Sequence, residues 1–574
     1  MIGEERISSE RVDDVPVIIK QLERMGVKQL LDKCFVTHGN WQGESLGSIG
    51  IIWLSYILSQ ADHRLSHVQG WVGKRLESLK KLVGEELREL DLSDDRLESL
   101  LRYLSQDKNW HSFEEQLSRS IIQVYALSPE QVSIDSTTGS SYCGVNSEGL
   151  FQWGHSKDNR PDLAQVKMML STLDPLGMPV ATEILSGDKA DDPLYIPAVK
   201  RVRSTLPYSG LLYIGDSKMS SKATRAEIAS GEDYYLCPLS TKQLKEEQIR
   251  QYLQPVWQGK QQLTPIDYDY ANGESKQIAE GFEIEIDKTT QLEGLEVNWK
   301  ERQLVVRSLS LAKTQEKSLR LRLQKTEDAF RKLKIPRRGK KKLTNIEQWK
   351  SATEAILNRY GTVELFRLDF KLQRVQKLKR RYLTRPSQII ESVSVEFNFE
   401  IDSLAVEQQI KLLGWRIYAT NHSCTQLSLE QAVRAYRHQY LTERGFERLK
   451  GFPLSLTPIY LQREDHVTGL IRLLSIGLRV LTLLEFQVRS NLHDSQQKLA
   501  GIYPGNPHRE TSCPTAEMLL AAFKEITLTL VEVQPQVYIA HLTTLSELQQ
   551  RILTLLGFST TIYTQLTAQS FTPG

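Results

Sequence analysis

The spacing of hydrophobic residues changes several times along this chain. From residue 12 to about 125, apolar residues recur at helical intervals, as in the run from Leu46 to Leu58. Ser93 stands where an N-cap would begin a helix through Leu104. The pattern predicts an all-α N-terminal domain over residues 1–125.

From residue 126 the pattern becomes short apolar runs of strand length. The predicted strands are Gln131–Asp135, Val166–Thr172, Pro179–Leu185, Leu211–Gly215 and Tyr234–Pro238. Helical spacing at Asp192–Val202 and Ser221–Ala229 separates the later strands, and Asp174–Gly177 reads as a turn. The order of three strands, helix, strand, helix, strand is typical of an α/β sheet with helices packed on it, here over residues 126–240.

Roughly 200 residues then separate Cys237 from a helical segment at Tyr436. A structureless loop of that size is implausible, so we expect an inserted domain over residues 241–410. Its predicted strands are Phe282–Ile286, Leu304–Leu309 and Val393–Ile401, and its predicted helices are Ser310–Lys334 and Ile346–Tyr360.

The C-terminal part returns to helical spacing. Residues 411–492 are predicted to complete the α/β core, and residues 493–574 to form a helical tail with a helix over Thr511–Val531. The most apolar stretch, Gly469–Val488, contains two arginines and a glutamate, which favours a buried core helix over a membrane span. No basic region followed by an apolar run opens the chain, so no signal peptide is expected.

Composition is that of a globular protein, and the charge distribution says more than the total. Of 574 residues 40% are apolar and 25% charged, with a net charge of only +3. Two dense basic blocks would attract phosphate. The first holds Arg331, Lys332, Lys334, Arg337, Arg338, Lys340, Lys341 and Lys342, and the second Lys371, Arg374, Lys377, Lys379, Arg380, Arg381 and Arg385. The five scattered cysteines suit a reducing cytosol.

Three carboxylates form the candidate chemistry. Asp135 and Asp216 each follow an apolar run, and the carboxyl ends of adjacent strands can converge on one point. Read as one helix, the segment Tyr436–Lys450 places Tyr436, Glu443 and Lys450 within about 40° on one face. A carboxylate is a hard oxygen ligand for Mg²⁺, and a neighbouring ammonium can pair with a phosphate.

This pattern resembles the DDE-type bacterial insertion-sequence transposases, in the branch whose third acid lies in a Tyr-x2-Arg-x3-Glu-x6-Lys motif. Tyr436, Glu443 and Lys450 match that motif, whereas Gln439 occupies the arginine position and Arg437 lies two residues earlier. The segments Gly154–Asp162 and Trp415–Asn421 are similar to the same branch, and the resemblance covers roughly residues 12 to 535.

The resemblance implies a ribonuclease H-like core interrupted by a large α+β insertion, and an enzyme that cuts element ends and joins them to target DNA. Asp135, Asp216 and Glu443 would bind two Mg²⁺ ions, with Mn²⁺ as the substitute. Expected DNA contacts are Tyr436, Arg437, Lys450, His155, Lys157, Arg160 and Trp299, the last by stacking on an unpaired base. The implied setting is a homodimer on DNA, cytoplasmic and associated with the nucleoid, with no membrane partner.

Other readings stay open at this point. A ribonuclease H-like nuclease without strand transfer would share the three acids. A catalytically inactive or domesticated relative would bind DNA without cutting it. The helical N-terminal region suits either DNA binding or a scaffold and dimerisation unit, and on the second reading the whole chain could be an interaction protein.

Overall fold

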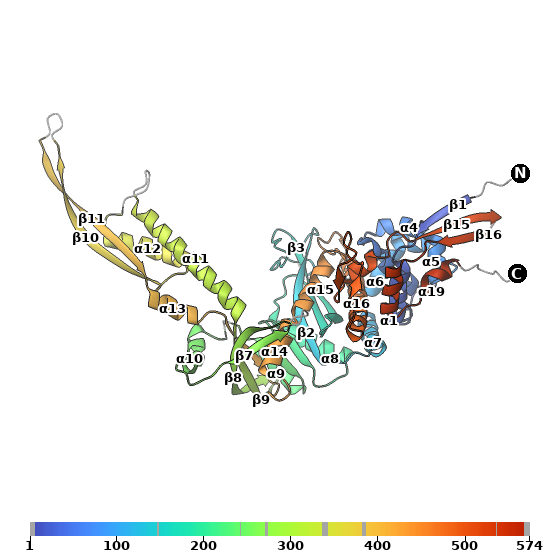
Figure 1. Cartoon of the computed structure of the whole chain (residues 1–574), viewed down its shortest axis with the longest axis horizontal. Helices are drawn as coiled ribbons and strands as arrows, with labels where there is room; N and C mark the ends of the chain where they lie inside the picture. Colours follow the sequence, from blue (N-terminus) through green and yellow to red (C-terminus); the bar gives the residue numbers. More distant parts are fainter. Residues whose placement is uncertain are drawn as a thin grey trace. The chain divides into compact units, whose positions relative to one another are not determined.

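The protein divides into two compact units, which we describe separately (Figure 1). The structure is a computed structural model and describes residues 6–145, 148–240, 243–269, 274–335, 343–380, 386–534 and 537–567. The first unit comprises Met1–Cys237, Asp287–Trp299 and Arg434–Gly574, and the second Pro238–Ile286 and Lys300–Val433. The finer division into five segments stays a prediction.

The N-terminal region is helical from residue 15 to residue 124, as predicted. Its helices are α1 (Val15–Met25), α2 (Val27–Cys34), α3 (Leu46–Gln60), α4 (Leu65–Gly73), α5 (Leu76–Val83), the 3₁₀ turn η1 (Glu89–Leu92), α6 (Asp94–Leu104) and α7 (Asp107–Val124). Ser93 precedes α6 as expected. A strand that was not predicted, β1 (Arg6–Arg11), comes before the helices.

A mixed sheet follows, and its order agrees with the predicted alternation. The strands are β2 (Gln131–Ser141), β3 (Ala164–Asp174), β4 (Met178–Ser186), β5 (Leu212–Gly215) and β6 (Tyr234–Pro238), with η2 (Asp192–Leu194), α8 (Tyr195–Thr205) and α9 (Lys222–Ser230) between them. They lie in the order β4-β3-β2-β5-β6. Neighbours β2, β5 and β6 are parallel, whereas β3 runs antiparallel to both β2 and β4. An α/β fold is therefore confirmed.

The apolar helix near the C-terminus is a core element. After α14 (Leu429–Arg437) and α15 (Tyr440–Lys450), α16 spans Glu464–Asp494 and contacts β4 and α6. By length and composition α16 could cross a membrane, but 94% of its most apolar window is buried inside the protein. Its burial confirms the predicted core helix.

The prediction of a helical tail is wrong in part. The segment predicted as one helix over Thr511–Val531 forms the short helix α17 (Ala516–Ala521) and then β15 (Thr527–Gln534). Thr527–Gln534 alternates polar and apolar residues, which is strand periodicity. β15 pairs with β1 and with β16 (Val537–Leu542), so the two ends of the described chain share one sheet. The remaining elements of this region are β13 (Leu499–Ala500), β14 (Glu510–Thr511), α18 (Glu547–Leu556), α19 (Thr561–Thr564) and η3 (Gln565–Thr567).

The second unit contains a second group of strands and a helical arm. Its strands are β7 (Thr264–Asp269), β12 (Trp415–Thr420) and the greater part of β8 (Ser275–Leu292) and β9 (Leu295–Ser308), whose hairpin residues 287–299 belong to the first unit. They lie in the order β12-β9-β8-β7. The other elements are α10 (Glu246–Trp257), α11 (Leu309–Lys334), α12 (Ile346–Tyr360), β10 (Phe366–Lys379), β11 (Gln388–Ile401) and α13 (Ser403–Lys411). Both predicted helices and all three predicted strands are present, whereas β7, β10, β12, α10 and α13 were missed.

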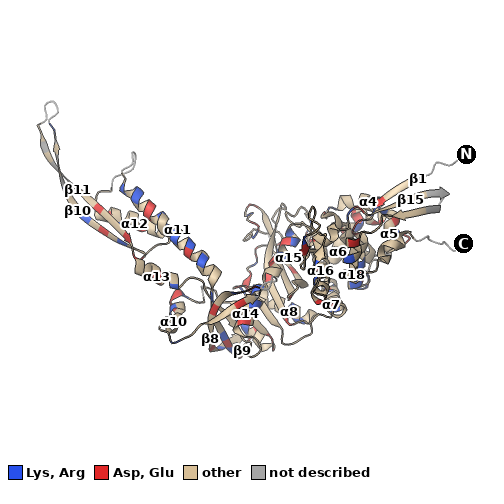
Figure 2. Cartoon of the chain, in the orientation of Figure 1, with Lys and Arg blue, Asp and Glu red and all other residues tan. Residues whose placement is uncertain are grey.

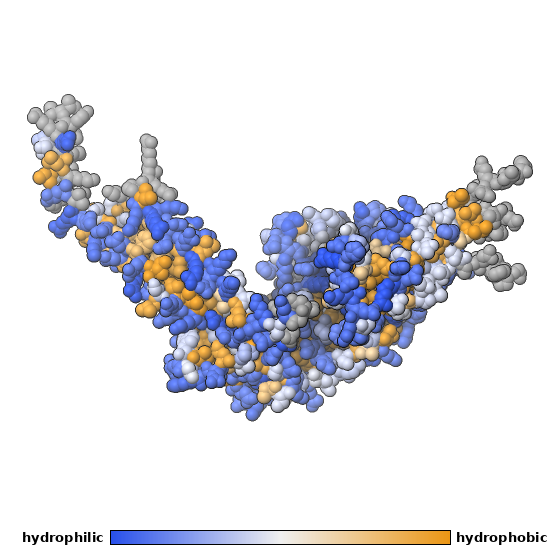
Figure 3. Space-filling model, viewed as in Figure 1, coloured by the Kyte–Doolittle hydropathy of each residue, from blue (hydrophilic) through white to orange (hydrophobic). Residues whose placement is uncertain are grey.

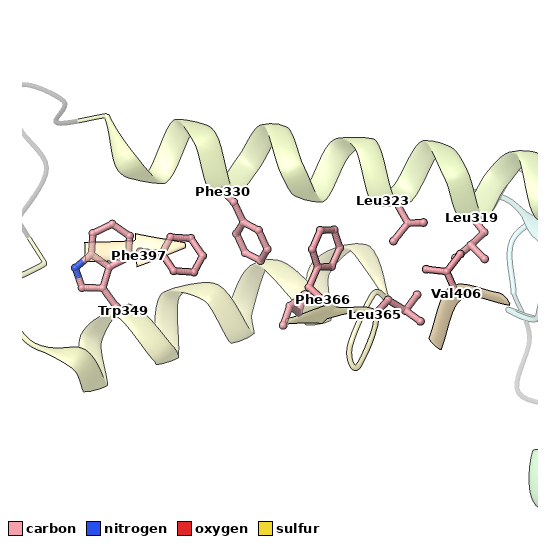
Figure 4. Close-up of a cluster of buried hydrophobic side chains, with 9 residues drawn as sticks. Leu319, Leu323, Phe330, Trp349, Leu365, Phe366, Phe397 and Val406 are labelled. Carbon is pink, nitrogen blue, oxygen red and sulfur yellow. The ribbon is translucent and has the colours of Figure 1, made fainter. Parts of the chain in front are cut away.

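The arm has its own hydrophobic core, shown in Figure 4. Phe330 of α11 is fully buried between the rings of Phe366 and Phe397, at centroid distances of 5.4 Å each. Trp349 of α12 packs on Phe397 at 5.4 Å. Two helices and a two-stranded ribbon therefore bury one aromatic cluster. Of the basic blocks, residues Arg337, Arg338, Lys340, Lys341, Lys342, Arg381 and Arg385 lie outside the described residues.

Candidate active site

Asp135 and Asp216 lie side by side because their strands are parallel neighbours. β2 pairs with β5 from Gln131↔Leu212 to Ile134↔Gly215, so the next position in this register joins Asp135 to Asp216. Parallel strands lie about 4.8 Å apart, and residues at matching positions share a face. The sheet therefore brings together two carboxylates that are 81 positions apart in the sequence.

Asp135 itself is not at a strand end, and that prediction is wrong. β2 continues for six residues beyond it to Ser141. Its polar second half remains a strand because β3 pairs with it as far as Ser141↔Ala164. Asp135 instead marks the position where β2 loses β5 as its neighbour.

Asp216 is fixed from two directions. The phenol of Tyr195, at the start of α8, donates a hydrogen bond to Asp216 Oδ1 at 2.7 Å, and the Lys218 amide donates to the same oxygen at 2.9 Å. Tyr195 is 1% exposed. Burial, followed by the nearby carboxylates of Asp216 and Asp135, raises the pKa of Tyr195 well above its ordinary value, so the phenol keeps its proton and acts as a donor.

Glu443 is carried by a helix that is shorter than predicted. A turn at His438–Gln439 divides Tyr436–Lys450 into the end of α14 and the whole of α15, so the prediction of one continuous helix is wrong. The amides of Leu441 and Thr442 bond to carbonyls only three residues back, which tightens the chain at this point. Glu443 and Lys450 remain on one helix and one face, but Tyr436 belongs to the preceding helix.

The opposite side of α15 is anchored to the core. Thr442 and Thr172 of β3 share a buried hydrogen bond of 2.8 Å between their hydroxyls. Arg444 binds both oxygens of Glu485 on α16, at 2.7 and 3.0 Å, and Arg448 bonds to the same carboxylate. These contacts hold α15 against the sheet and leave Glu443 on its exposed side.

The three acids influence one another electrostatically. The pKa of Asp135 is raised overall to about 6: burial raises it most, the Lys157 ammonium and the Ser136 amide act to lower it, and the carboxylates of Asp216 and Glu443 raise it by smaller amounts. Glu443 therefore lies within electrostatic range of Asp135, although it comes from a distant part of the chain. Like charges gathered at a buried position create a demand for a cation.

The donor set suits Mg²⁺ in its chemistry, since hard carboxylate oxygens are what this ion takes. Burial is the largest cause of the raised pKa of Asp135, and a divalent ion at this position would favour the ionised carboxylate. Within the described residues, however, no group of three or more His, Cys, Asp and Glu side chains is close enough to hold a metal ion. The acids share one region without forming a closed cage.

Lys450 is held beside β2 by its own chain. Its ammonium donates to Asp158 Oδ1 at 2.6 Å and to Thr137 Oγ1 at 3.0 Å, and Thr137 is two residues beyond Asp135. Asp158 Oδ2 in turn accepts the Ser140 amide at 3.0 Å. Lys450 is 19% exposed at its side chain, so its charge faces the site at a fixed place on the strand.

The predicted contacts in the loop after β2 differ in position. Lys157 lies beside the acids, with its Nζ 3.9 Å from Asp135 Oδ1 and 3.0 Å from Ser136 Oγ. Arg160 forms a paired interaction with Asp162 at 2.9 and 2.7 Å, on the surface. His155 is exposed. Of these three candidates, the structure brings only Lys157 to the carboxylates.

The other candidate contacts lie on separate elements. Tyr436 and Arg437 are half-buried in the last turn of α14, and both interact with other groups of the protein. The half-buried Trp299, in the β8–β9 hairpin, donates its indole N–H to the Tyr235 hydroxyl at 2.8 Å. That bond fixes the indole in the absence of DNA, and base stacking by Trp299 stays a prediction.

Tyr195, Asp158 and the pair Lys167–Asp191 were not found from the sequence. Lys167 Nζ donates to Asp191 Oδ1 at 2.5 Å, and its side chain is only 7% exposed. Burial acts to raise the pKa of Asp191, but Lys167 and then Lys157 lower it overall. A lysine inside the apolar run Val166–Thr172 was the one available signal, since buried lysines need a partner.

Comparison with known proteins adds little at the level of sequence. No model of a protein family matches the chain, and no curated protein matches it. Among solved structures, it is similar to a cryo-EM structure of a piggyBac transposase synaptic complex with hairpin DNA. The TM-score is 0.35 and the identity 9%, over 99% of this chain and 89% of that chain. A likeness at this level identifies neither family nor activity, so the residues themselves must carry the assignment.

Proposed function

We propose that this chain is a DDE-type DNA transposase of an insertion sequence, which cuts DNA at the element ends and joins the freed 3′-hydroxyl to target DNA. The observation that carries the proposal is the meeting of Asp135 and Asp216 in one parallel register, with Glu443 within electrostatic range. The strand order β4-β3-β2-β5-β6, with acids on the two central parallel strands, supports a ribonuclease H-like core.

In this proposal Asp135, Asp216 and Glu443 would hold two Mg²⁺ ions. When bound, the ions supply water activation and neutralise charge on the phosphate. Tyr195 keeps Asp216 in one orientation through its 2.7 Å hydrogen bond, and thereby fixes one wall of the site. Positioning of this kind accounts for a large part of phosphoryl-transfer catalysis.

The cations around the acids would hold the DNA strand. Lys450 is fixed near Thr137 by Asp158, so its charge can pair with a phosphate beside the reacting one. Lys157 partly neutralises Asp135 before any ion binds. Both lysines are positioned by bonds to β2 or its following loop, so the strand that carries the first acid also carries the expected phosphate contacts.

The experiment is metal-dependent nicking of DNA by the full chain, with Asp135→Ala, Asp216→Ala and Glu443→Ala as variants. Each variant should bind DNA as the wild type does and lose more than about 99% of Mg²⁺-dependent cleavage. Asp188→Ala is the matched control, since Asp188 is an exposed carboxylate bonded to Ser186 in the same unit. Retained cleavage in any one of the three would reassign the site.

Two outcomes would favour the other readings. Cleavage without joining of the 3′-hydroxyl to a second DNA would indicate a ribonuclease H-like nuclease. DNA binding with no cleavage by the wild type would indicate an inactive or domesticated relative. The second outcome is the more informative one. Among the described residues the three acids do not form a closed metal site, so Glu443 has to approach the two aspartates before catalysis.

A further inference from the structure

The ribbon β10–β11 extends past the helices that cover it. The two strands pair in register from Phe366↔Ile401 to Lys379↔Gln388. Near its base, Phe397 is buried against α11 and α12. Four apolar side chains in the outer part of the ribbon are more than half exposed, at 59% for Leu372, 65% for Leu378, 62% for Ile389 and 52% for Val393. We call residues 372–380 and 386–395 the distal ribbon.

The exposed apolar residues form one stripe. Directly paired residues of antiparallel strands point to the same face, and alternate pairs share it. The pairs Phe370↔Phe397, Leu372↔Val395 and Leu378↔Ile389 therefore belong to the same face as the buried core. The stripe continues the arm's hydrophobic core, and among the described residues no helix covers it. Figure 3 shows apolar surface along this arm.

A bare two-stranded ribbon is marginally stable in water, and an uncovered apolar stripe calls for a partner. The charge of the distal ribbon indicates which kind of partner this is. Residues 372–390 contain no Asp or Glu, and residues 372–380 include Arg374, Lys377, Lys379 and Arg380. Figure 2 shows Lys and Arg positions along the ribbon and α11. Glu391 is the one acid in the distal ribbon, against four basic residues, so the ribbon is basic overall and complementary to a polyanion.

The register of the two strands shows on which face of the ribbon Arg374 lies. Arg374 pairs with Val393 and so lies on the apolar face between Leu372 and Leu378, where it is exposed. Lys377 and Lys379 add two positive charges to the sequence of the same strand. Apolar side chains with one arginine among them are what minor-groove proteins insert, while lysines reach the phosphates on either side.

We propose that the distal ribbon binds duplex DNA with its apolar face in the minor groove, where Leu378 and Ile389 press on the base steps and Arg374 lies along the groove. This rests on the proposed function, because it names a contact through which the same enzyme would hold its DNA. The contact is independent of the three acids. It bends the duplex, since apolar insertion unstacks base steps.

The test uses the full chain and a duplex of 30 base pairs, labelled at both ends, with anisotropy for affinity and energy transfer for bending. Arg374→Ala and the double change Leu378→Ser with Ile389→Ser should each weaken binding by about tenfold. The double change removes no charge, yet it should also abolish the bend. A loss of bend without a loss of charge is a result that general electrostatic attraction would not produce.

Two matched controls exist in the same arm. Lys350→Ala removes one exposed positive charge from α12, and Leu321→Ser removes a 50% exposed leucine from α11. Both should bind within about twofold of the wild type and keep the bend. Circular dichroism melts of all variants show whether the arm stays folded. Normal DNA binding by the folded Arg374 variant or by the folded Leu378 and Ile389 double variant would overturn the proposal.

The alternative occupant of the stripe is a second copy of this chain. If the Leu378 and Ile389 double variant dissociates a dimer in sedimentation while DNA binding and bending persist, the proposal is overturned. Failure of the ribbon and failure of the enzyme are separable. If the wild type cuts DNA and the ribbon variants bind and bend DNA as the wild type does, only the ribbon contact is rejected. If the ribbon variants bind DNA more weakly but the wild type cuts no DNA, only the catalytic proposal is rejected.

Discussion

At the scale of single residues, the candidate site depends on groups that support the acids as much as on the acids. Asp216 takes two hydrogen bonds on one oxygen, from the Tyr195 phenol and the Lys218 amide. Asp135 Oδ1 accepts the Ser136 amide at 2.7 Å. Because each carboxylate has a defined rotamer before any ion binds, little reordering is needed on binding.

Replacing Tyr195 with phenylalanine keeps the buried ring and removes the bond to Asp216. We expect cleavage to slow by about tenfold with unchanged DNA affinity, since a hydrogen bond to a charged group contributes about 1.5–3 kcal/mol. Single-turnover cleavage and anisotropy measure the two effects.

The control is Tyr125→Phe, which removes a buried hydrogen bond of 2.7 Å from Gln21, a residue of α1. Both variants should lose similar stability, but only the first should cut slowly. Equal cleavage rates for the two would show that Tyr195 has a structural role alone.

Asp174, at the end of β3, gives the fold a pH dependence. Burial raises its pKa to about 7, although the Ser133 hydroxyl bonds to it and acts to lower the pKa. The folded state therefore holds this proton more tightly than the unfolded state does. The stabilising contribution is complete below about pH 4 and is lost as the pH rises through about 7.

Asp174→Asn cannot ionise and should escape this loss. Between pH 5 and pH 8 its stability relative to the wild type should improve by about 2–3 kcal/mol. Urea unfolding of both proteins at the two pH values measures the difference. A constant difference across this range would mean that Asp174 has an ordinary pKa in the folded protein.

At the scale of elements, the packing of α15 decides where the Glu443 carboxylate lies relative to the sheet, because α15 carries this residue. Glu485 of α16 is 5% exposed and receives Arg444, Arg448 and Arg489, and it also accepts the Ala516 amide at 2.9 Å. One carboxylate thus joins α15 to α16 and to the start of α17. The orientation of Glu443 depends on this network through the backbone of α15.

Glu485→Ala should therefore affect both stability and cleavage. Leaving three arginines around an empty position is expected to cost about 3–5 kcal/mol in the free energy of unfolding. Chemical denaturation measures the loss, and cleavage at a temperature where the variant is folded measures the displacement of Glu443.

Glu517→Ala is the milder comparison, since Glu517 is 25% exposed and pairs with Arg448 alone among these arginines. We expect this variant to lose about 1 kcal/mol in the free energy of unfolding. A Glu485 variant no less stable than the Glu517 variant would contradict the role given to the network.

At the scale of the whole molecule, distant parts of the chain meet in each unit. β1 pairs with β15 from Arg6↔Glu532 to Arg11↔Thr527, so the N-terminal strand completes a sheet near the other end of the chain. Within the first unit, α7 and α16 meet through the fully buried pair Glu114–Arg479 at 2.7 Å. The second unit has a separate aromatic core in its arm.

The sequence by itself predicted many of the local elements and supplied the three candidate acids. The sequence predicted α3, α11 and α12 closely, because α3 is one continuous apolar segment and α11 and α12 carry apolar residues at helical spacing. The apolar runs before Asp135 and Asp216 predicted β2 and β5 for the same reason. Glu443 followed from its spacing to Lys450, which one helix preserves.

Tertiary structure decided everything that depends on a neighbour. The polar end of β2 is a strand because β3 pairs with it. A turn at His438–Gln439 ends α14, and α15 begins directly after it. Tyr195 and Asp158 gained their roles from side chains that are distant in sequence. Periodicity records which face of an element is buried, but it carries no information on which partner buries it.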